Sequence, residues 1–389
     1  MFNYLEKIDK NIYSFVTTES VKHCDCIVHA KDYFNFRKKL DQRKFDYIEL
    51  PFISAFGIKL ELKEVISLAK CKVVNFISKS TKVFSQAFVS KKVLKVDSFY
   101  NRGMYGDGGT IAVIDTGVYP HLDFLVPKNR LIKFVDLVDG KDKPYDDNGH
   151  GTMVASLALG YGTQYMGKYS GMSPRSNLVV VKAIESSGET ASTKILQAMQ
   201  WVYDNRAKYN IKVCCMSFGS TPSEGFDPLS AGAESLWRAG ITVVAAAGNS
   251  GPESYSIKSP GINNRIITVG GLDDKRQSEE FVEGSFTVAD FSSRGPTSSG
   301  YKPDLIAPAV NIVGAKKGGG YCEMSGTSVA TPLIAGICSL ISSRYPKISP
   351  DEIKVRLLRS CKKVTYDRNS EGFGLLDCSN LFNMWLVIF

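Results

Sequence analysis

The sequence predicts an α/β protein with a doubly wound, mainly parallel sheet after residue 109, preceded by a small α+β domain. Two observations support the sheet. Short, uninterrupted apolar runs recur after residue 109, and helical segments separate most of them. Strands that are buried on both faces of a parallel sheet have this texture. Before residue 85, strand-like segments alternate with helix-like ones, which predicts the smaller domain.

Length and composition are those of a globular protein with two domains. The chain has 389 residues, of which 43% are hydrophobic, and the composition indicates neither disorder nor a fibre. No run of about 18 apolar residues occurs, so we expect no membrane span and no membrane partner. The start, MFNYLEKIDKNIYSF, has early acidic residues and no continuous apolar core, so it does not predict a secretory signal.

The basic charge is concentrated in the first hundred residues. They hold 18 Lys and Arg against 11 Asp and Glu, a net charge of +7, whereas the remainder holds 30 against 28, a net charge of +2. A basic chain can bind nucleic acid, but acidic residues separate the basic ones here. We interpret the charge as a solvated surface, or one that faces an acidic partner, and expect no nucleic-acid partner.

The nine cysteines favour reduced thiols. Their number is odd, their spacing is irregular, and Cys214 and Cys215 are adjacent in an apolar run. This pattern favours buried thiols in a cytoplasmic protein over a disulfide framework, with non-classical secretion as the alternative location. Cys24 and Cys26, near two histidines, leave a metal site as an alternative. Their spacing fits no zinc pattern, so we favour an alternating strand.

The first domain, residues 1–85, is predicted to have the order βαββαβ. Its segments are a strand at 26–30, a helix at 32–44, two short strands within 45–61, a helix at 62–71 and a strand at 72–80. Residues 86–108 have little periodicity and end in a glycine-rich stretch. We interpret them as a linker.

The second domain, residues 109–389, carries the predicted parallel sheet. Its apolar strands are expected at 110–115, 177–184, 211–217, 241–247 and 265–270. The segment 192–205 predicts a helix, because Ile195, Met199 and Val202 fall on one helical face.

Polar groups and glycines follow three of these strands. Asp115 ends the first strand, Gly219 follows the third, and Gly248-Asn249 follows the fourth. In doubly wound sheets the ligand site lies beyond the carboxyl ends of the strands. The sequence therefore predicts a site at this edge.

Three side chains are candidates for chemistry, although each has a structural alternative. A carboxylate at Asp115, at the end of an apolar strand, is either partnered or functional. His150 lies between two glycines, which allow close approach but also suit a surface turn. Ser328 lies near the predicted start of a helix that reaches about residue 342, and Pro332 places that start within one turn. A hydroxyl there is commonly a cap, but the helix start also stabilises an anion.

Together the three form a nucleophile, a base and an orienting carboxylate. A serine needs a base within reach, and the base needs a group that orients it. The chain order Asp115, His150, Ser328 is that of subtilisin, and differs from that of chymotrypsin and of the α/β-hydrolases.

The chain resembles the subtilisin-like serine proteases (subtilases, peptidase family S8) over about residues 110–380. The matching motifs are AVIDTGV 112–118, NGHGTMVAS 148–156, AAAGNSG 245–251 and SGTSVATPLIAG 325–336. It is most similar to their intracellular, AprX-like branch, through DTGVYPHLDF, KPYDDNGHGT, FSSRGPT and KPDLIAPAVNIVGA. Met153 stands where the family often has a second histidine, outside the triad.

The resemblance implies a serine endopeptidase that hydrolyses peptide bonds through an acyl-enzyme. Asp115 then orients His150, which is the general base and later the acid, and Ser328 attacks the carbonyl. Asn249 and the Ser328 N–H form the oxyanion hole; the alternative for Asn249 is a plain loop residue between glycines.

The resemblance also implies that peptide binds as an added strand. The matching segments are 185–190, with Gly188, and 217–219, which with 246–249 line the S1 pocket. The substrate-binding residues are thus expected to be Gly188, Ser217, Phe218, Gly219 and Gly248. For Gly188 a plain turn glycine is the stronger alternative.

The first domain then resembles a propeptide, which helps folding and inhibits the enzyme, with its last strand and tail near residues 75–86 in the cleft. The chemistry needs no cofactor. A structural calcium ion is left open, because Asp123 matches a ligand position of some family members while the loop expected to complete the site, around 160–171, has no carboxylate.

Two other functions compete with an active protease. The first is a catalytically silent subtilase fold that serves as a binding or regulatory protein, against which the intact triad and Asn249 argue. The second is an esterase of the α/β-hydrolase kind. It requires Gly-x-Ser-x-Gly at the nucleophile, whereas the sequence around Ser328 is Gly-Thr-Ser-Val-Ala.

Overall fold

The computed structural model describes residues 4–9, 12, 23–79, 87–276, 284–298 and 300–383. The chain divides into two compact units, Met1–Val83 and Phe84–Phe389. Each has its own hydrophobic core. The tail expected near residues 75–86 continues past the last strand into residues 80–86, which lie outside the described residues.

The described part of the first unit is a four-stranded antiparallel sheet with the helices α2 and α3, in the strand order β2-β3-β1-β4. Its elements are η1 (Tyr4–Lys7), β1 (Cys24–Ala30), α2 (Tyr33–Gln42), β2 (Tyr47–Leu50), η2 (Pro51–Ile53), β3 (Ala55–Leu60), α3 (Leu62–Ala69) and β4 (Val74–Lys79). The predicted βαββαβ order is therefore confirmed.

Local sequence explains these elements. The side chain of Asp32 accepts a hydrogen bond from Asn35 N at 3.0 Å and caps α2. In β1, Cys24, Cys26 and Val28 point toward the core and alternate with more exposed residues. The strand interpretation of the two cysteines thus holds. Within the described residues, no group of three His, Cys, Asp or Glu side chains is placed to hold a metal ion.

The segment expected to be a linker, residues 86–108, contains two helices, α4 (Ala87–Leu94) and α5 (Asp97–Tyr100). Val93, Leu94 and Phe99 are buried in the core of the second unit. The apolar residues of this segment are close together but too few for a clear helical period, because each helix is short.

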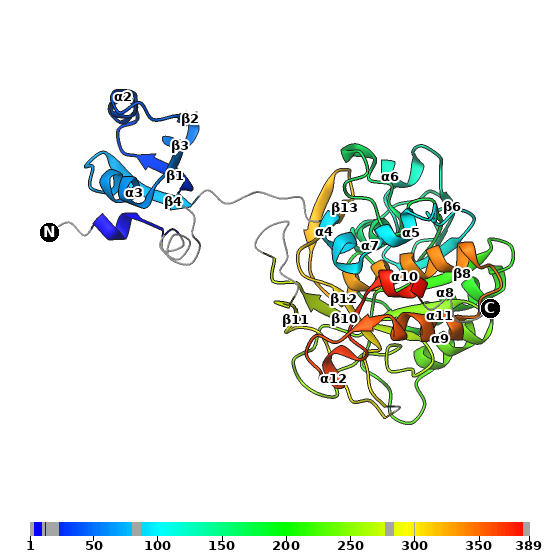
Figure 1. Cartoon of the computed structure of the whole chain (residues 1–389). Coiled ribbons are helices and arrows are strands. Elements are labelled where there is room, and N and C mark those ends of the chain that lie inside the picture. The colour runs from blue at the N-terminus through cyan, green and yellow to red at the C-terminus, as the bar shows by residue number, and fades with distance from the viewer. Residues whose placement is uncertain are drawn as a thin grey trace. The chain divides into compact units, whose positions relative to one another are not determined.

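The second unit is built on a ten-stranded, mainly parallel sheet (Figure 1). The strand order is β15-β16-β12-β10-β9-β8-β5-β7-β6, with β11 paired antiparallel to β10. Its strands are β5 (Thr110–Asp115), β6 (Leu131–Asp136), β7 (Asn177–Lys182), β8 (Ile211–Met216), β9 (Thr242–Ala246), β10 (Ile267–Asp273), β11 (Thr287–Val288), β12 (Leu305–Pro308), β15 (Cys361–Lys362) and β16 (Leu375–Leu376); a separate hairpin is formed by β13 (Ile312–Ala315) and β14 (Tyr321–Met324). The predicted doubly wound fold is confirmed.

Helices pack on the sheet in two groups. One group is α7 and α10, which contact each other and the central strands; in Figure 1 they lie side by side near the middle of the unit. The other is α8 and α9, which contact each other, with α8 against β5 and α9 against β9. The helices of this unit beyond α4 and α5 are α6 (Leu122–Leu125), α7 (His150–Leu159), η3 (Thr163–Tyr165), α8 (Ser192–Asn205), α9 (Pro228–Arg238), α10 (Thr327–Arg344), α11 (Pro350–Arg359), α12 (Arg368–Glu371) and α13 (Cys378–Asn383).

The connections reverse direction around β5, which places the site. β7 lies on one side of β5 and β8 on the other, both parallel to it. Loops that leave neighbouring strands at such a switch point form a crevice at the carboxyl edge of the sheet. Asp115 ends β5 at this point. None of the described helices is both long and apolar enough to cross a membrane.

Candidate active site

Asp115 and His150 form a direct hydrogen bond. The Asp115 side chain is fully buried at the end of β5, and its Oδ1 lies 2.7 Å from His150 Nδ1. Oδ1 also accepts a hydrogen bond from Thr116 N at 2.7 Å. Because an ionised carboxylate only accepts hydrogen bonds, Nδ1 is the protonated ring nitrogen and Nε2 of the neutral ring is left as a base.

Asp146 holds the loop that presents His150. This buried carboxylate accepts hydrogen bonds from Gly149 N at 2.7 Å and from Thr152 N at 2.9 Å, on either side of the histidine. It also accepts one from Thr116 Oγ1 at 3.0 Å, next to Asp115. One carboxylate therefore ties the start of α7 to the end of β5.

The two glycines that flank His150 are required for different structural reasons. Gly149 has φ 111°, a conformation that favours glycine. At Gly151, a Cβ would collide with the backbone of Gly117 and lie 3.2 Å from Asp115 Cβ. These glycines let α7 approach β5 closely enough for the Asp115–His150 hydrogen bond.

Burial lowers the pKa of His150, but the charge of Asp115 and its hydrogen bond, with a further contribution from the charge of Asp146, outweigh this effect. The net pKa is raised above the ordinary value of 6.5. Asp115 thus stabilises the imidazolium form, which a general base passes through during the reaction.

Ser328 and Asn249 face a common space around Gly326. Ser328 is the second residue of α10 and is partly exposed. A Cβ on Gly326 would lie 3.2 Å from Ser328 Oγ and 3.2 Å from Asn249 Nδ2. Gly326 also has φ 149°, which disfavours a larger residue. The missing side chain leaves room between a hydroxyl and an amide.

Thr327 fixes the orientation of the Asn249 amide. The Asn249 Oδ1 accepts hydrogen bonds from Thr327 N at 2.9 Å and from Thr327 Oγ1 at 3.0 Å. The other end of the amide, Nδ2, is then the donor, and it has no hydrogen-bond partner among the described residues. A donor that is free and aimed at the space beside Ser328 can bind a developing oxyanion.

The serine and histidine come from helices that pack against each other, α10 and α7. Within the described part of the chain, no hydrogen bond joins Ser328 Oγ to His150. Catalytic hydrogen bonds are often long without substrate and shorten in the Michaelis complex. The arrangement therefore places an imidazole, a hydroxyl and a side-chain amide donor at one edge of the sheet.

The five expected substrate-binding residues lie in loops at this edge. Gly219 and Gly248 both adjoin the side chain of Lys258. Gly188 has φ 86°, and its nearest neighbour is Asn148 Nδ2, at 3.7 Å from a Cβ placed there. Phe218 is partly exposed. Ser217 is buried, and its Oγ lies 3.6 Å from Cys215 Sγ, so this hydroxyl points into the core.

Sequence reasoning missed Asp146, Thr116, Thr327 and Lys258. Asp146 stands in a run with Asp147 and Asn148, which reads as an ordinary polar turn. Thr116 and Thr327 directly adjoin Asp115 and Ser328, which is the one signal that pointed to them. Nothing local marks Lys258, because its relation to the site depends on the fold.

The surroundings of Asp123 do not fit a calcium ion. Its Oδ1 accepts hydrogen bonds from Tyr321 OH at 2.7 Å and from Thr163 N at 2.9 Å. The guanidinium of Arg130 donates to the Asp123 carbonyl oxygen, and the ring of His121 lies 3.5 Å from Oδ1. Calcium needs six to eight oxygen ligands, whereas hydrogen-bond donors already occupy Oδ1, and Oδ2, which is buried without a hydrogen-bond partner among the described residues, is the single oxygen that this carboxylate has left to offer.

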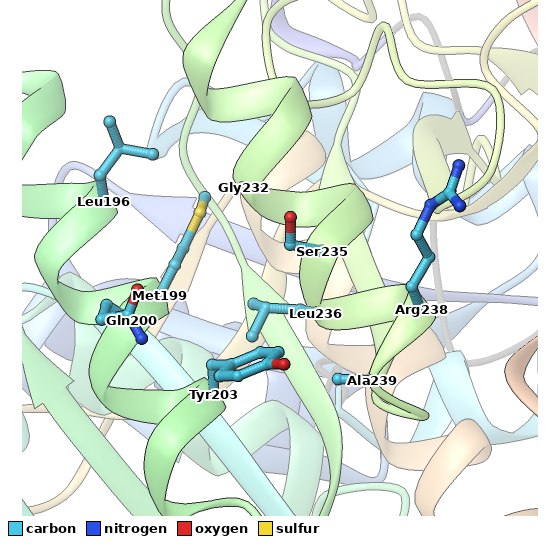
Figure 2. A pocket seen from close by; sticks show the side chains of 9 residues that line it. All are labelled: Leu196, Met199, Gln200, Tyr203, Gly232, Ser235, Leu236, Arg238 and Ala239. Carbon is cyan, nitrogen blue, oxygen red and sulfur yellow. The ribbon is translucent and has the colours of Figure 1, made fainter.

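A cavity of about 540 Å³ lies between α8 and α9, away from the triad. Figure 2 shows Met199, Tyr203 and Leu236 lining it, with Gln200 and Arg238 at its margin. It contains neither a nucleophile paired with a base nor a cluster of metal ligands. The cavity is therefore not a second catalytic centre.

Comparisons with known proteins agree with this geometry. The Subtilase family model matches residues 106–375. Serine protease AprX of Bacillus subtilis (strain 168) is 40% identical over 298 residues, which cover 71% of this chain and 66% of AprX. A thermostable alkaline protease of Halalkalibacterium halodurans is 30% identical over 80% of this chain and 78% of its own length. The solved S41 psychrophilic protease is 28% identical, covers 71% of this chain and 96% of its own, and has a TM-score of 0.62. The family match over most of the second unit, with the Asp115–His150 pair and the SGTSVATP helix start inside it, shows that the chain belongs to the subtilase family of serine proteases.

Proposed function

We propose that this subtilase is a serine endopeptidase in which Asp115, His150 and Ser328 form the triad and Asn249 the oxyanion hole. The observation that carries the proposal is the 2.7 Å contact between Asp115 Oδ1 and His150 Nδ1. It orients the ring and fixes Nε2 as the base. The orientation of the Asn249 amide by Thr327 adds independent support.

The proposed reaction has two halves. Ser328 Oγ attacks the peptide carbonyl carbon, its proton passes to His150 Nε2, and the oxyanion accepts hydrogen bonds from Asn249 Nδ2 and the Ser328 N–H. The C–N bond then breaks, and the same proton passes to the leaving amine. Water attacks the acyl-enzyme with His150 again as base, and the carboxylic acid and free Ser328 are released.

Substrate peptides are proposed to bind as an extended strand along Gly188 and residues 217–219. Gly188 is exposed in the loop after β7, and the loop after β8 leads to the exposed Gly219. Main-chain groups in such loops can pair with a peptide regardless of its side chains. This mode suits an endopeptidase that acts on many protein substrates.

We also propose that the first unit acts as a propeptide-like inhibitor and folding helper. It has a core of its own. One face of its sheet is not covered by α2 or α3 and presents Ile48, 70% exposed, and Phe76, 37% exposed. By the strand register these two residues lie on the same face. Exposed apolar side chains on a sheet face suit a protein-binding role.

A cytoplasmic location is proposed on the state of the cysteines. All nine are free, and Cys214, Cys215, Cys338 and Cys378 are among the buried ones. Paired thiols are rare in reducing compartments. If the proposal holds, protein taken from its native cells and unfolded without reductant should take up nine alkyl groups, and uptake of fewer would indicate disulfides.

Casein cleavage by the full chain tests the catalytic proposal. Wild type should release fragments, and Ser328→Ala should release essentially none while showing the same circular dichroism spectrum. Ser325→Ala is a matched control, because Ser325 is an exposed hydroxyl three residues earlier that bonds Asn311 rather than the site. Equal cleavage by wild type and Ser328→Ala would refute the proposal. A folded wild type without any cleavage would favour the silent binding protein.

A further inference from the structure

The side chain of Lys258 lies between the two glycines expected in the S1 pocket. A Cβ at Gly219 would lie 2.6 Å from Lys258 Cβ, and a Cβ at Gly248 would lie 2.5 Å from Lys258 Cγ. Both distances are shorter than van der Waals contact. The space beside each glycine is therefore filled by the aliphatic stem of one lysine.

The backbone around Lys258 is anchored to both strand ends. Lys258 N donates to Ala247 O at 2.9 Å, just after β9. Ser259 and Ser220 exchange two hydrogen bonds of 2.9 Å, which tie the same segment to the loop after β8. The stem thus has a fixed origin, and the ammonium lies three atoms beyond Cγ.

The Lys258 ammonium has no partner among the described residues, where no hydrogen bond or ion pair reaches its Nζ. The carboxylate of Asp227, which is hydrogen-bonded to the neighbouring Ser259, already has its own donors. Asp227 accepts hydrogen bonds from Ser259 Oγ at 2.5 Å, from Ser230 N at 2.7 Å and from Ser223 N at 2.9 Å. A partly buried cation without a counter-charge favours an anionic ligand.

The site fixes which part of a substrate meets this cation. The attacked carbonyl must lie between Ser328 Oγ and Asn249 Nδ2. The family resemblance assigns Gly219 and Gly248 to the S1 pocket, so the side chain on the amino side of the scissile bond (P1) is expected to lie beside these two glycines. The space beside them is the one Lys258 enters.

We propose that Lys258 makes this protease prefer Asp or Glu at P1. The inference rests on the proposed endopeptidase function. The P1 carboxylate pairs with the Lys258 ammonium at the end of the pocket, and the stem fills the volume that a large apolar P1 side chain would need. Lys258 is thus a specificity-determining residue.

The test uses four peptide p-nitroanilides that differ only at P1, which is Glu, Gln, Phe or Lys. Active sites are first counted with a fluorophosphonate probe. For wild type we expect kcat/KM for Glu to exceed that for its isostere Gln by about tenfold or more, as a hydrogen bond between charged groups provides. Rising salt should reduce this ratio.

Two variants and a control separate charge from packing. Lys258→Gln keeps most of the stem and should bring the Glu to Gln ratio close to one. Lys258→Glu should cleave after Lys faster than after Glu. Lys347→Gln removes an equally positive charge from an exposed position beyond the far end of α10 and should leave the wild-type ratio unchanged.

Equal cleavage after Glu and Gln by the wild type, or a ratio that survives Lys258→Gln, would overturn the inference while leaving the protease intact. Preference for Phe over Glu would overturn it as well. A titrated, folded enzyme that cleaves none of the four peptides nor casein would refute the proposed function itself, which distinguishes the two failures.

Discussion

The two ends of the Asn249 amide have different partners. Thr327 donates both of its hydrogen bonds to the oxygen, and the nitrogen has no hydrogen-bond partner among the described residues. This division makes a residue exposed at a loop tip into a donor of fixed direction. Preorganised donors of this kind stabilise the transition state more than the bound substrate.

Asn249→Ala should therefore lower kcat by about 10²–10³-fold with little change in KM. Because alanine also removes the acceptor for Thr327, Asn249→Asp is the matched variant, since it keeps acceptor oxygens but loses the donor. Steady-state kinetics on one peptide measures both. Recovery of kcat in Asn249→Asp would mean that the bond to Thr327, and not the donor, is what catalysis needs.

The pH dependence follows from His150. Its pKa is raised above 6.5 by Asp115, after the opposing effect of burial. The base acts when neutral, so kcat/KM should fall as pH drops through a midpoint above 6.5.

Asp115→Asn removes the charge that raises this pKa. The acid midpoint should move to lower pH, while kcat falls by about 10⁴-fold through loss of the correct tautomer. A pH profile of each protein measures both effects. An unmoved midpoint would show that Asp115 does not control the charge of His150.

Among the elements, the starts of α7 and α10 present His150 and Ser328. The sequence already indicated these residues and the strand ends beside them. Asp115 ends one apolar strand, Asn249 follows another, and the run of small residues predicts the start of α10. Pro332 was expected within the first turn, but α10 begins at Thr327, so the proline is its sixth residue. A proline has no N–H to donate to the Ser328 carbonyl four residues earlier, so α10 continues through Pro332 with one intrahelical hydrogen bond fewer.

Gly326→Ala should lower kcat by about 10²-fold, because a Cβ there would displace Ser328 Oγ or Asn249 Nδ2. Gly167→Ala is the control for backbone strain. It has φ 85° and nothing within 4 Å of the added Cβ. We expect it to lose stability only, by about 1–2 kcal/mol. Similar kcat values for the two variants would contradict the proposed shared space.

Asp146→Ala should loosen the start of α7. It leaves buried donors of Gly149, Thr116 and Thr152 without an acceptor, each costing about 1–3 kcal/mol. Urea unfolding in a Ser328→Ala background, which prevents self-digestion, measures the loss. Asp142→Ala, an exposed carboxylate of the same loop, should change little. Equal stability of both variants would exclude the anchoring role.

Strand prediction succeeded in the centre of the sheet and failed at its edges. The five apolar runs correspond to β5, β7, β8, β9 and β10. β6 was missed because the charged Lys133 interrupts its apolar pattern and only Phe134 of the strand is buried. The strands β15 and β16 have two residues each. Pairing with neighbouring strands, rather than local sequence preference, therefore determines their strand conformation.

For the molecule as a whole, the chain order of the candidate catalytic residues could be predicted from the sequence, but their contacts in space could not. The chain order of the triad gave the family resemblance, and the family match confirmed it. The place of Lys258 in the site depends on the fold, which brings residues 219, 248 and 258 together. The place of Asp146 depends in the same way on the contact of residues 116, 146 and 149. Contacts between distant segments of this kind have no signature in a single sequence.

The two-unit organisation predicts self-cleavage. The wild type should shorten on incubation through a cut between the first unit and Asp115, whereas Ser328→Ala should stay full length. Intact mass over time measures this, and a rate that does not change with protein concentration would indicate an intramolecular cut. Wild type that remains full length for hours while cleaving casein would show that self-processing is not required.

The most direct test of the proposed triad is to map the covalent adduct of a fluorophosphonate probe. Full-length wild type and His150→Ala are treated in parallel, digested with trypsin and analysed by mass spectrometry. We expect one adduct, on Ser328, in the wild type, and a labelling rate lower by several orders of magnitude in His150→Ala. An adduct on another serine, or equal labelling of both proteins, would contradict the proposal that His150 activates Ser328.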